Sequence, residues 1–157
     1  MRIMQKIANG SGDFAFVDST RKQKAQKSVD KGIECILNCQ ITFNGKLTAL
    51  CQQHNEKALE PDYARAYELP SISTYESFEI VMFIRSLPDA KKSVAVIKSI
   101  NAAVKWFDSV KIENKKWDWN ADKSDKVLTD VSGSTIWARF YDLNNSSSMA
   151  LRLECYE

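Results

Sequence analysis

Apolar residues recur at helical spacing in three parts of the chain, which predicts helices at Ser19–Cys39, Ser73–Leu87 and Asp89–Val110. Each helix has a residue near its start that can cap free backbone amides. The expected caps are Asp18 or Ser19, Ser73 in a capping box with Glu76, and Asp89. The positions expected to face the core are Ala25, Val29, Ile33, Ile36, Leu37, Phe78, Val81, Phe83, Ile84, Leu87, Val94, Ile97, Ile100, Val104 and Phe107.

Shorter apolar stretches predict a small amount of β-structure. Gln40–Leu50 is expected to form a hairpin, because Asn44-Gly45 at its centre tolerates the positive φ angles of a tight turn. Val127–Leu128 and Ile136–Tyr141 have the composition of short strands, whereas the rest of residues 111–134 is expected to be irregular. A short helix is expected before Gly10-Ser11-Gly12. Periodicity therefore predicts a mainly α fold with minor β-structure.

The segment Leu47–Ile72 follows neither period. It reads LTALCQQHNEKALEPDYARAYELPSI and combines the chain's only histidine, His54, with four carboxylates, two tyrosines, Arg65 and two prolines. A long polar loop inside a domain of ordinary size is usually functional. We therefore expect the candidate site to lie in this loop.

Composition narrows the classes of partner. The 157 residues are 44% hydrophobic and 27% charged, which fits a single domain over residues 1–157, and we expect a monomer. The basic stretch Arg21–Lys27 lacks interleaved aromatic residues, so no nucleic-acid partner is expected. No apolar run reaches the length of a membrane span, so no membrane partner is expected either.

The four cysteines predict neither a disulfide scaffold nor a zinc site. There is no CxxC pair, and His54 is the only histidine that could add a ligand. Cys35 and Cys39 lie four residues apart on a predicted helix and could share a face. The favoured interpretation is that the cysteines are small buried side chains.

Four segments in the same order resemble the family-ten pectate lyases, bacterial enzymes that cleave polygalacturonate by β-elimination. They are the polar loop described above, GDFAFVDSTRKQKAQKSVDKGIECILNCQITF at residues 12–43, YESFEIVMFIRSLP and AVKWFDSVKI within residues 75–112, and WARFYDL at residues 137–143. The resemblance implies a partial (α/α) toroid with a small β-hairpin and short irregular strands. It further implies the C-terminal part of a catalytic module, without its first half and extreme end. The complete protein would be secreted or periplasmic, and no signal peptide is expected in this chain.

The resemblance implies that Arg65, in the motif ARAYE, is the catalytic base that removes the C5 proton of a galacturonate. A guanidinium is protonated at ordinary pH, so this role needs cationic surroundings that favour its neutral form. Alkaline activity would follow. From spacing alone, the favoured interpretation of Arg65 is a structural ion pair with Glu68 on one helical turn.

The resemblance also implies that Arg139, in WARFYD, binds a substrate carboxylate, and that His54, Tyr67 and Glu68 contact substrate. Strand-like alternation would place Arg139 on one face with the tryptophan and tyrosine two residues away on either side. Alternatives remain for each residue. Arg139 could stack on aromatic rings at the surface, His54 could fix the loop, and Tyr67 could simply pack.

Calcium is the cofactor that the resemblance implies, because a divalent cation can neutralise the uronate carboxylate. The aspartates expected to bind it have no counterpart in this chain, so we name no metal ligand. Two further departures are Thr74, where the family has glycine, and the run Asn144–Ser148 after WARFYDL. We expect polygalacturonate or oligogalacturonates as partners, a carbon–oxygen lyase in the complete module, and little or no activity from this chain alone. The alternatives are a non-catalytic acidic-glycan-binding domain and a structural helical domain.

Overall fold

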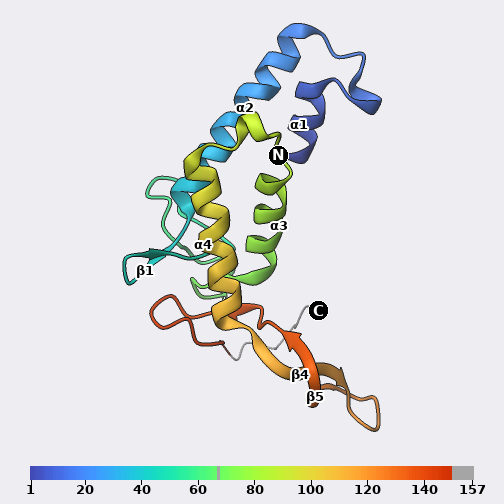
Figure 1. The fold of residues 1–157 in the computed structure, drawn as a ribbon, viewed down its shortest axis with the longest axis vertical. Helices are drawn as coiled ribbons and strands as arrows, with labels where there is room; N and C mark the ends of the chain where they lie inside the picture. The colour runs from blue at the N-terminus through green and yellow to red at the C-terminus, as the bar shows by residue number, and fades with distance from the viewer. Residues whose placement is uncertain (67, 150–157) are drawn as a thin grey trace.

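The computed structural model describes residues 1–66 and 68–149, in which three longer helices pack together above a group of short strand pairs (Figure 1). The helices are α1 (Arg2–Asn9), α2 (Ser19–Cys39), α3 (Thr74–Arg85) and α4 (Val94–Val110), with 3₁₀ turns η1 (Gly12–Phe14) and η2 (Asp89–Lys91). The strands are β1 (Thr42–Phe43), β2 (Lys46–Leu47), β3 (Ile72–Ser73), β4 (Ile112–Trp119), β5 (Lys126–Ile136) and β6 (Phe140–Tyr141). Among the described residues, no helix is long and apolar enough to cross a membrane.

The end of α1 and both ends of α2 lie where the sequence predicts. α2 has the predicted bounds, and the carboxylate of Asp18 caps it by accepting a hydrogen bond from the Arg21 backbone N–H at 2.9 Å. This contact satisfies an amide that has no partner inside the helix. α1 ends at Gly10, whose φ of 61° is one that glycine adopts readily.

The starts of α3 and α4 differ from the prediction. The Ser73 hydroxyl donates to the Glu76 carboxylate and accepts no backbone amide, so the expected capping box is not formed. Asp89 opens the separate turn η2 instead of capping α4. Ser93 caps α4 by accepting from the Val96 N–H at 3.3 Å. Serine caps as well as aspartate does, and Ser93 directly precedes the apolar stretch.

Two clusters of buried apolar side chains hold these elements together. The first joins the middle of α2 to the end of α3 and the start of α4 through Val29, Ile33, Phe83, Ile84, Leu87 and Val96. The second joins the strand pairs to the end of α4 through Ile41, Ala49, Cys51, Ile72, Trp106, Ala138 and Tyr141. Full burial of one large aliphatic side chain stabilises a fold by about 1.5–3 kcal/mol. The second cluster therefore supports both segments that carry predicted site residues.

The buried face of α4 is only partly the one that the spacing predicts, because Ile100 and Phe107 pack against the core but the other predicted positions do not. Val94, Ile97 and Val104 are 84%, 47% and 53% exposed, and Phe78 of α3 is 53% exposed. The positions that α4 buries are Val96, Ser99, Ala103 and Trp106. α4 is apolar on both sides, so periodicity alone could not select the inward face, and the small residues on the buried side allow close packing. The exposed side of α4 and α3 enclose a mainly apolar cleft of about 480 Å³.

The predicted hairpin around Asn44-Gly45 is confirmed. β1 pairs with β2 in antiparallel register, and both turn residues have positive φ, 48° for Asn44 and 72° for Gly45. These are the backbone angles that a tight two-residue hairpin turn requires.

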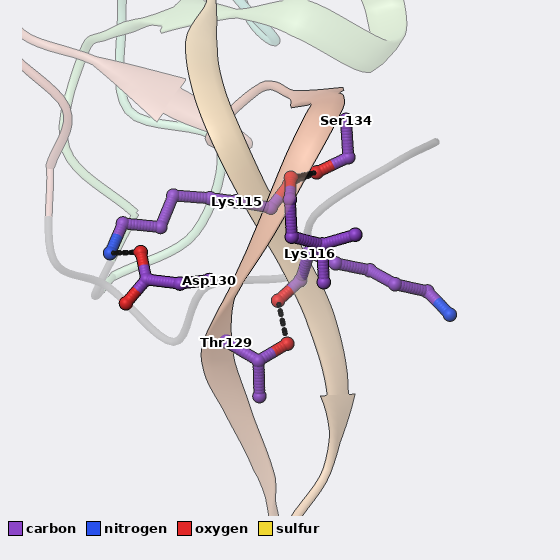
Figure 2. Close-up of polar contacts among 6 residues, drawn as sticks. Lys115, Lys116, Thr129, Asp130 and Ser134 are labelled. Atoms are coloured by element: carbon purple, nitrogen blue, oxygen red, sulfur yellow. Dashed lines mark hydrogen bonds and ion pairs between the residues drawn. The ribbon is translucent and has the colours of Figure 1, made fainter.

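The prediction of irregular structure for residues 111–134 is wrong. β4 and β5 form a long antiparallel hairpin that projects from one end of the molecule (Figure 1). Figure 2 shows its polar contacts: the Lys115 amine pairs with the Asp130 carboxylate, and the Thr129 hydroxyl donates to the Lys116 carbonyl at 3.2 Å. Because most of this hairpin is exposed, its strands need no alternation of apolar and polar residues, and they therefore carry no strong strand signal.

Candidate active site

Extended backbone from four parts of the chain meets around β3. Cys51 bridges Ile72, and Ile72 also pairs with Tyr141 of β6. Tyr141 in turn bridges Ser148. The polar loop therefore leaves and re-enters the body of the protein beside β6, although β6 is some seventy residues away in sequence.

Ser77 of α3 fixes the entry to the polar loop. Its fully buried hydroxyl accepts a hydrogen bond from the Leu50 N–H at 2.9 Å and donates to the Leu50 carbonyl at 3.0 Å. The Ser73 N–H donates to the same carbonyl at 2.9 Å. The sequence analysis did not identify Ser77, and its only signal is a small polar residue inside an apolar helix.

A compact turn within the loop holds His54. His54 bridges Pro61 in antiparallel fashion, and the Asn55 N–H donates to the Glu60 carbonyl at 2.8 Å. The Asn55 side chain accepts two further backbone N–H groups of the turn, at 2.9 and 3.0 Å. These local bonds give the histidine a defined backbone position in a loop without helix or strand.

The His54 imidazole is half-buried, and burial disfavours its charged form. Burial lowers its pKa below the ordinary value of 6.5, and a hydrogen bond with the Cys39 backbone opposes that shift. Nε2 is buried and has no hydrogen-bond partner among the described residues. A neutral imidazole with one unsatisfied nitrogen can exchange a hydrogen bond with a ligand hydroxyl or carboxylic group.

Arg65 and Glu68 form the ion pair that their spacing favours. Arg65 Nη1 lies 3.3 Å from Glu68 Oε1, and the Glu68 N–H donates to the Arg65 carbonyl at 3.0 Å. The two residues face each other across a tight turn, not along a helical turn as predicted. The Arg65 side chain is 61% exposed, whereas the Glu68 side chain is 11% exposed. The guanidinium therefore projects outward from a carboxylate that is largely buried.

Arg139 lies just before β6 and is held by the start of α3. Its backbone carbonyl accepts hydrogen bonds from the Thr74 N–H at 3.0 Å and from the Thr74 hydroxyl at 3.3 Å, while the same hydroxyl bonds the Ala138 carbonyl at 2.9 Å. The guanidinium carbon is 5.1 Å from the centre of the Phe140 ring. The alternative in which Arg139 stacks on an aromatic ring is thus present. The Thr74 hydroxyl bonds the carbonyls of Ala138 and Arg139, a contact that glycine could not make.

The continuous strand expected over Ile136–Tyr141 is wrong. Ile136 is the last residue of β5, and β6 contains only Phe140–Tyr141. The Tyr141 hydroxyl accepts from the Ala138 N–H and donates to the Val110 carbonyl, both at 2.9 Å. Tyr141 is consequently buried, and the Trp137 indole points to the Phe107 carbonyl at 2.8 Å. Core packing competes with alternation here and determines the side-chain directions.

The structure places the two ends of the polar loop, Cys51 and Ile72, at the edge formed by β3 and β6. His54, Arg65 and Glu68 belong to one loop, whose ends lie beside β6 and hence near Arg139. Tyr67 lies outside the described residues. The convergence of the side chains on one groove stays a prediction. Besides His54 Nε2, the buried oxygens Gln52 Oε1 and Glu68 Oε2 lack hydrogen-bond partners within the described ranges, so this loop contains several polar atoms that a ligand could satisfy.

The residues of this loop do not fit a calcium site. Within residues 1–66 and 68–149, no three His, Cys, Asp or Glu side chains are grouped so that they could hold a metal ion. Calcium takes six to eight oxygen ligands, several of them from carboxylates. The described side chains of this loop therefore do not form a calcium site by themselves.

Comparison with solved structures identifies the architecture. The family 10 polysaccharide lyase from Cellvibrio cellulosa matches with a TM-score of 0.84 and 30% sequence identity, over 92% of this chain and 45% of that one. A mutant of that lyase in complex with trigalacturonic acid matches equally well. The chain thus spans less than half the length of the structures it matches. Its fold is mainly α and corresponds to part of an α/α toroid.

The family model for pectic acid lyase matches residues 1–152, and the chain belongs to this family. The resemblance seen in the sequence is confirmed by both comparisons. A comparison with curated protein sequences finds no match.

Proposed function

We propose that this chain forms the C-terminal part of a pectate lyase module that binds polygalacturonate and eliminates its glycosidic bond. In this proposal Arg65 is the base, and Arg139, His54, Tyr67 and Glu68 bind substrate. The observation that carries it is the pairing around β3, which places the ends of the polar loop beside the segment of Arg139. The trigalacturonic acid held by a related lyase supports this class of ligand.

The reaction follows from the acidity of the substrate. A base takes the C5 proton next to the uronate carboxylate, the C–H electrons form the C4–C5 double bond, and the C4–O bond breaks as the leaving oxygen gains a proton. Arg65 is exposed enough to reach such a proton. Its pairing with Glu68 stabilises the protonated guanidinium, so the base must move away from that carboxylate when substrate binds.

Sugar hydroxyls of the substrate can separate the pair. A hydroxyl that donates to the Glu68 carboxylate can replace Arg65 there, and the guanidinium then loses the anion that favours its protonated form. The buried Oε2 of Glu68, which has no hydrogen-bond partner among the described residues, could accept a further hydroxyl. Arg139, with its guanidinium beside the Phe140 ring, would bind a carboxylate of the polymer.

Calcium in the complete module would have to be held by groups other than the described side chains of this chain, so we assign it no step here. The proposal includes secretion of the complete bacterial enzyme, one domain over residues 1–157, and a monomer.

The absence of a metal-ligand cluster among the described residues favours a second function for the chain on its own, namely binding of acidic glycans without cleavage.

The test separates binding from chemistry. Purified chain is incubated with polygalacturonate at alkaline pH with calcium, and the unsaturated product is followed by its absorbance. Binding of trigalacturonic acid is measured by calorimetry in parallel. We expect weak binding that Arg139→Ala abolishes, and little or no product. Binding that is unchanged in both Arg65→Ala and Arg139→Ala would overturn the proposal.

A further inference from the structure

A second cleft, beside Tyr141 of β6, has a composition suited to an anion. It encloses about 660 Å³ between the β1–β2 hairpin, the last turns of α4 and residues 145–148. Its polar lining residues are Asn44, Lys46, Thr48, Lys105, Ser109, Lys111, Tyr141, Asn145, Ser146 and Ser148. Three lysines and no acidic residue line it, although acidic and basic residues are nearly equal in number in the whole chain.

Two of the three lysines have no carboxylate partner among the described residues. Lys111 is neutralised by Asp108 at 3.1 Å and Glu113 at 3.0 Å, and these contacts raise its pKa. Lys46 and Lys105 are exposed and form no such pair in the described part of the chain. The last turn of α4 contains no basic residue, so the helix dipole accounts for neither Lys105 nor Lys46 of β2.

Another part of the cleft wall is a polar loop held by several hydrogen bonds. The Asp142 carboxylate accepts the N–H groups of Asn144 and Asn145, at 2.7 and 3.2 Å, and Ser148 bridges Tyr141. The Trp106 indole donates to the Ser146 hydroxyl at 3.4 Å, which ties this loop to α4.

We propose that this lysine-lined cleft binds a uronate-containing oligosaccharide, as an additional site for the acidic polymer. A cleft of this size is within the range for small-ligand sites. The amines of Lys46 and Lys105 would contact carboxylates, while the side chains of Asn145 and Ser148 would meet sugar hydroxyls. This inference rests on the proposed function for the identity of the ligand, but it uses none of the predicted site residues Arg65, Arg139, His54, Tyr67 and Glu68.

The indole N–H signal of Trp106 can report binding in this cleft. Among the four tryptophans, Trp106 lines this cleft, whereas Trp137 lies two residues from Arg139. In a nitrogen-15-labelled chain, the two indole N–H signals can be assigned with Trp106→Phe and Trp137→Phe variants. Trigalacturonic acid is then titrated into the labelled chain, with a neutral trisaccharide and inorganic phosphate as comparison ligands.

We expect trigalacturonic acid to shift the Trp106 indole signal, and the neutral trisaccharide and phosphate to leave it in place. Lys46→Gln with Lys105→Gln should weaken this binding about tenfold or more, whereas Lys98→Gln, an exposed lysine of α4 outside the cleft, should not. A shift of Trp137 alone would overturn the second site and leave the proposed function standing. No shift of either signal would contradict both. An equal response to phosphate would show a general anion site and overturn the assignment to uronates.

Discussion

The polar loop and the β4–β5 hairpin both extend from the group of helices, but they differ in how they are attached to it. The loop has little internal structure, yet its ends are tied to α3 and β6 by buried groups such as Ser77 and Ile72. The hairpin is regular along its length, but its polar contacts, for example Lys115–Asp130, are largely exposed (Figure 2). Regular secondary structure and firm attachment are therefore separate properties in this protein.

This difference indicates where function lies. Binding residues need a fixed backbone, and buried hydrogen bonds supply it because an unsatisfied buried group is costly. The loop with His54, Arg65 and Glu68 has such anchors at both ends. The hairpin is stabilised mainly by its own cross-strand pairs. Substitutions at matched positions in the two regions should therefore have unequal effects.

The largest contrast is expected between two aliphatic truncations. Ile72→Ala removes a fully buried side chain next to the loop exit and should destabilise the fold by about 2–5 kcal/mol. Leu128→Ala, at a position 38% exposed on the hairpin, should cost about 0.5 kcal/mol or little more. Denaturant unfolding of the two variants measures both values. Equal losses would show that the hairpin is as firmly integrated as the loop.

A smaller contrast is expected for two serines. Ser77→Ala leaves the Leu50 N–H without its buried partner, and we expect a loss of about 1–3 kcal/mol. Ser134→Ala removes contacts of a hydroxyl with the Lys115 carbonyl at 2.9 Å and the Val131 carbonyl at 2.6 Å on the partly exposed hairpin, and should cost about 0.5 kcal/mol. Thermal unfolding at one pH suffices for the comparison. A Ser77→Ala variant as stable as the native chain would contradict the anchoring role.

The pH dependence tests the burial of His54. Its pKa is lowered in the folded state, so the unfolded chain binds the proton more readily. Stability from this residue is complete above the ordinary pKa of 6.5 and is lost as the pH falls through that value toward the lower folded pKa. His54→Gln should remove this part of the pH dependence. Because His54 is the only histidine, its imidazole signals titrate alone in a magnetic resonance spectrum. A midpoint at or above 6.5 would contradict the burial of the ring.

The smallest contrast concerns ion pairs. Glu68→Gln breaks the pair with the exposed Arg65, and Asp130→Asn breaks the pair with Lys115. In each pair one partner is well exposed, Arg65 at 61% and Asp130 at 85%, and pairs open to solvent contribute about 0–1 kcal/mol, so both variants should remain close to native stability. If the Glu68 pair serves binding and not stability, Glu68→Gln should change the affinity for trigalacturonic acid while Asp130→Asn does not. A large loss of stability in Glu68→Gln alone would favour a structural role for the pair.

Sequence predicts the elements whose signals are local. The bounds of α2, the Asp18 cap and the Asn44-Gly45 turn depend on nearby residues and are confirmed. α4 has two apolar sides, and its inward face is the side that meets α2 and α3. The local sequence of α4 does not show which side that is. The β4–β5 hairpin depends on cross-strand pairs in a solvent-exposed segment, where the apolar alternation that marks buried strands is weak.

The candidate site shows the same division. The polar loop is recognisable from composition, and the Arg65–Glu68 pair from spacing. The buried Ser77 contact and the rotation of Tyr141 into the core arise only when segments distant in sequence pack together. The roles of Arg65 and Arg139 rest on the family resemblance, since neither spacing nor periodicity assigns chemistry to an arginine.

The central claim is that Arg65 and Arg139 bind one polyuronate chain, and a crystal structure of this chain with trigalacturonic acid tests it most directly. The account predicts that both guanidiniums contact carboxylates of the same ligand, with the two groups about 10 Å apart or less, as suits arginines that span one or two sugars. A ligand bound elsewhere, or guanidiniums on opposite sides of the domain, would contradict it.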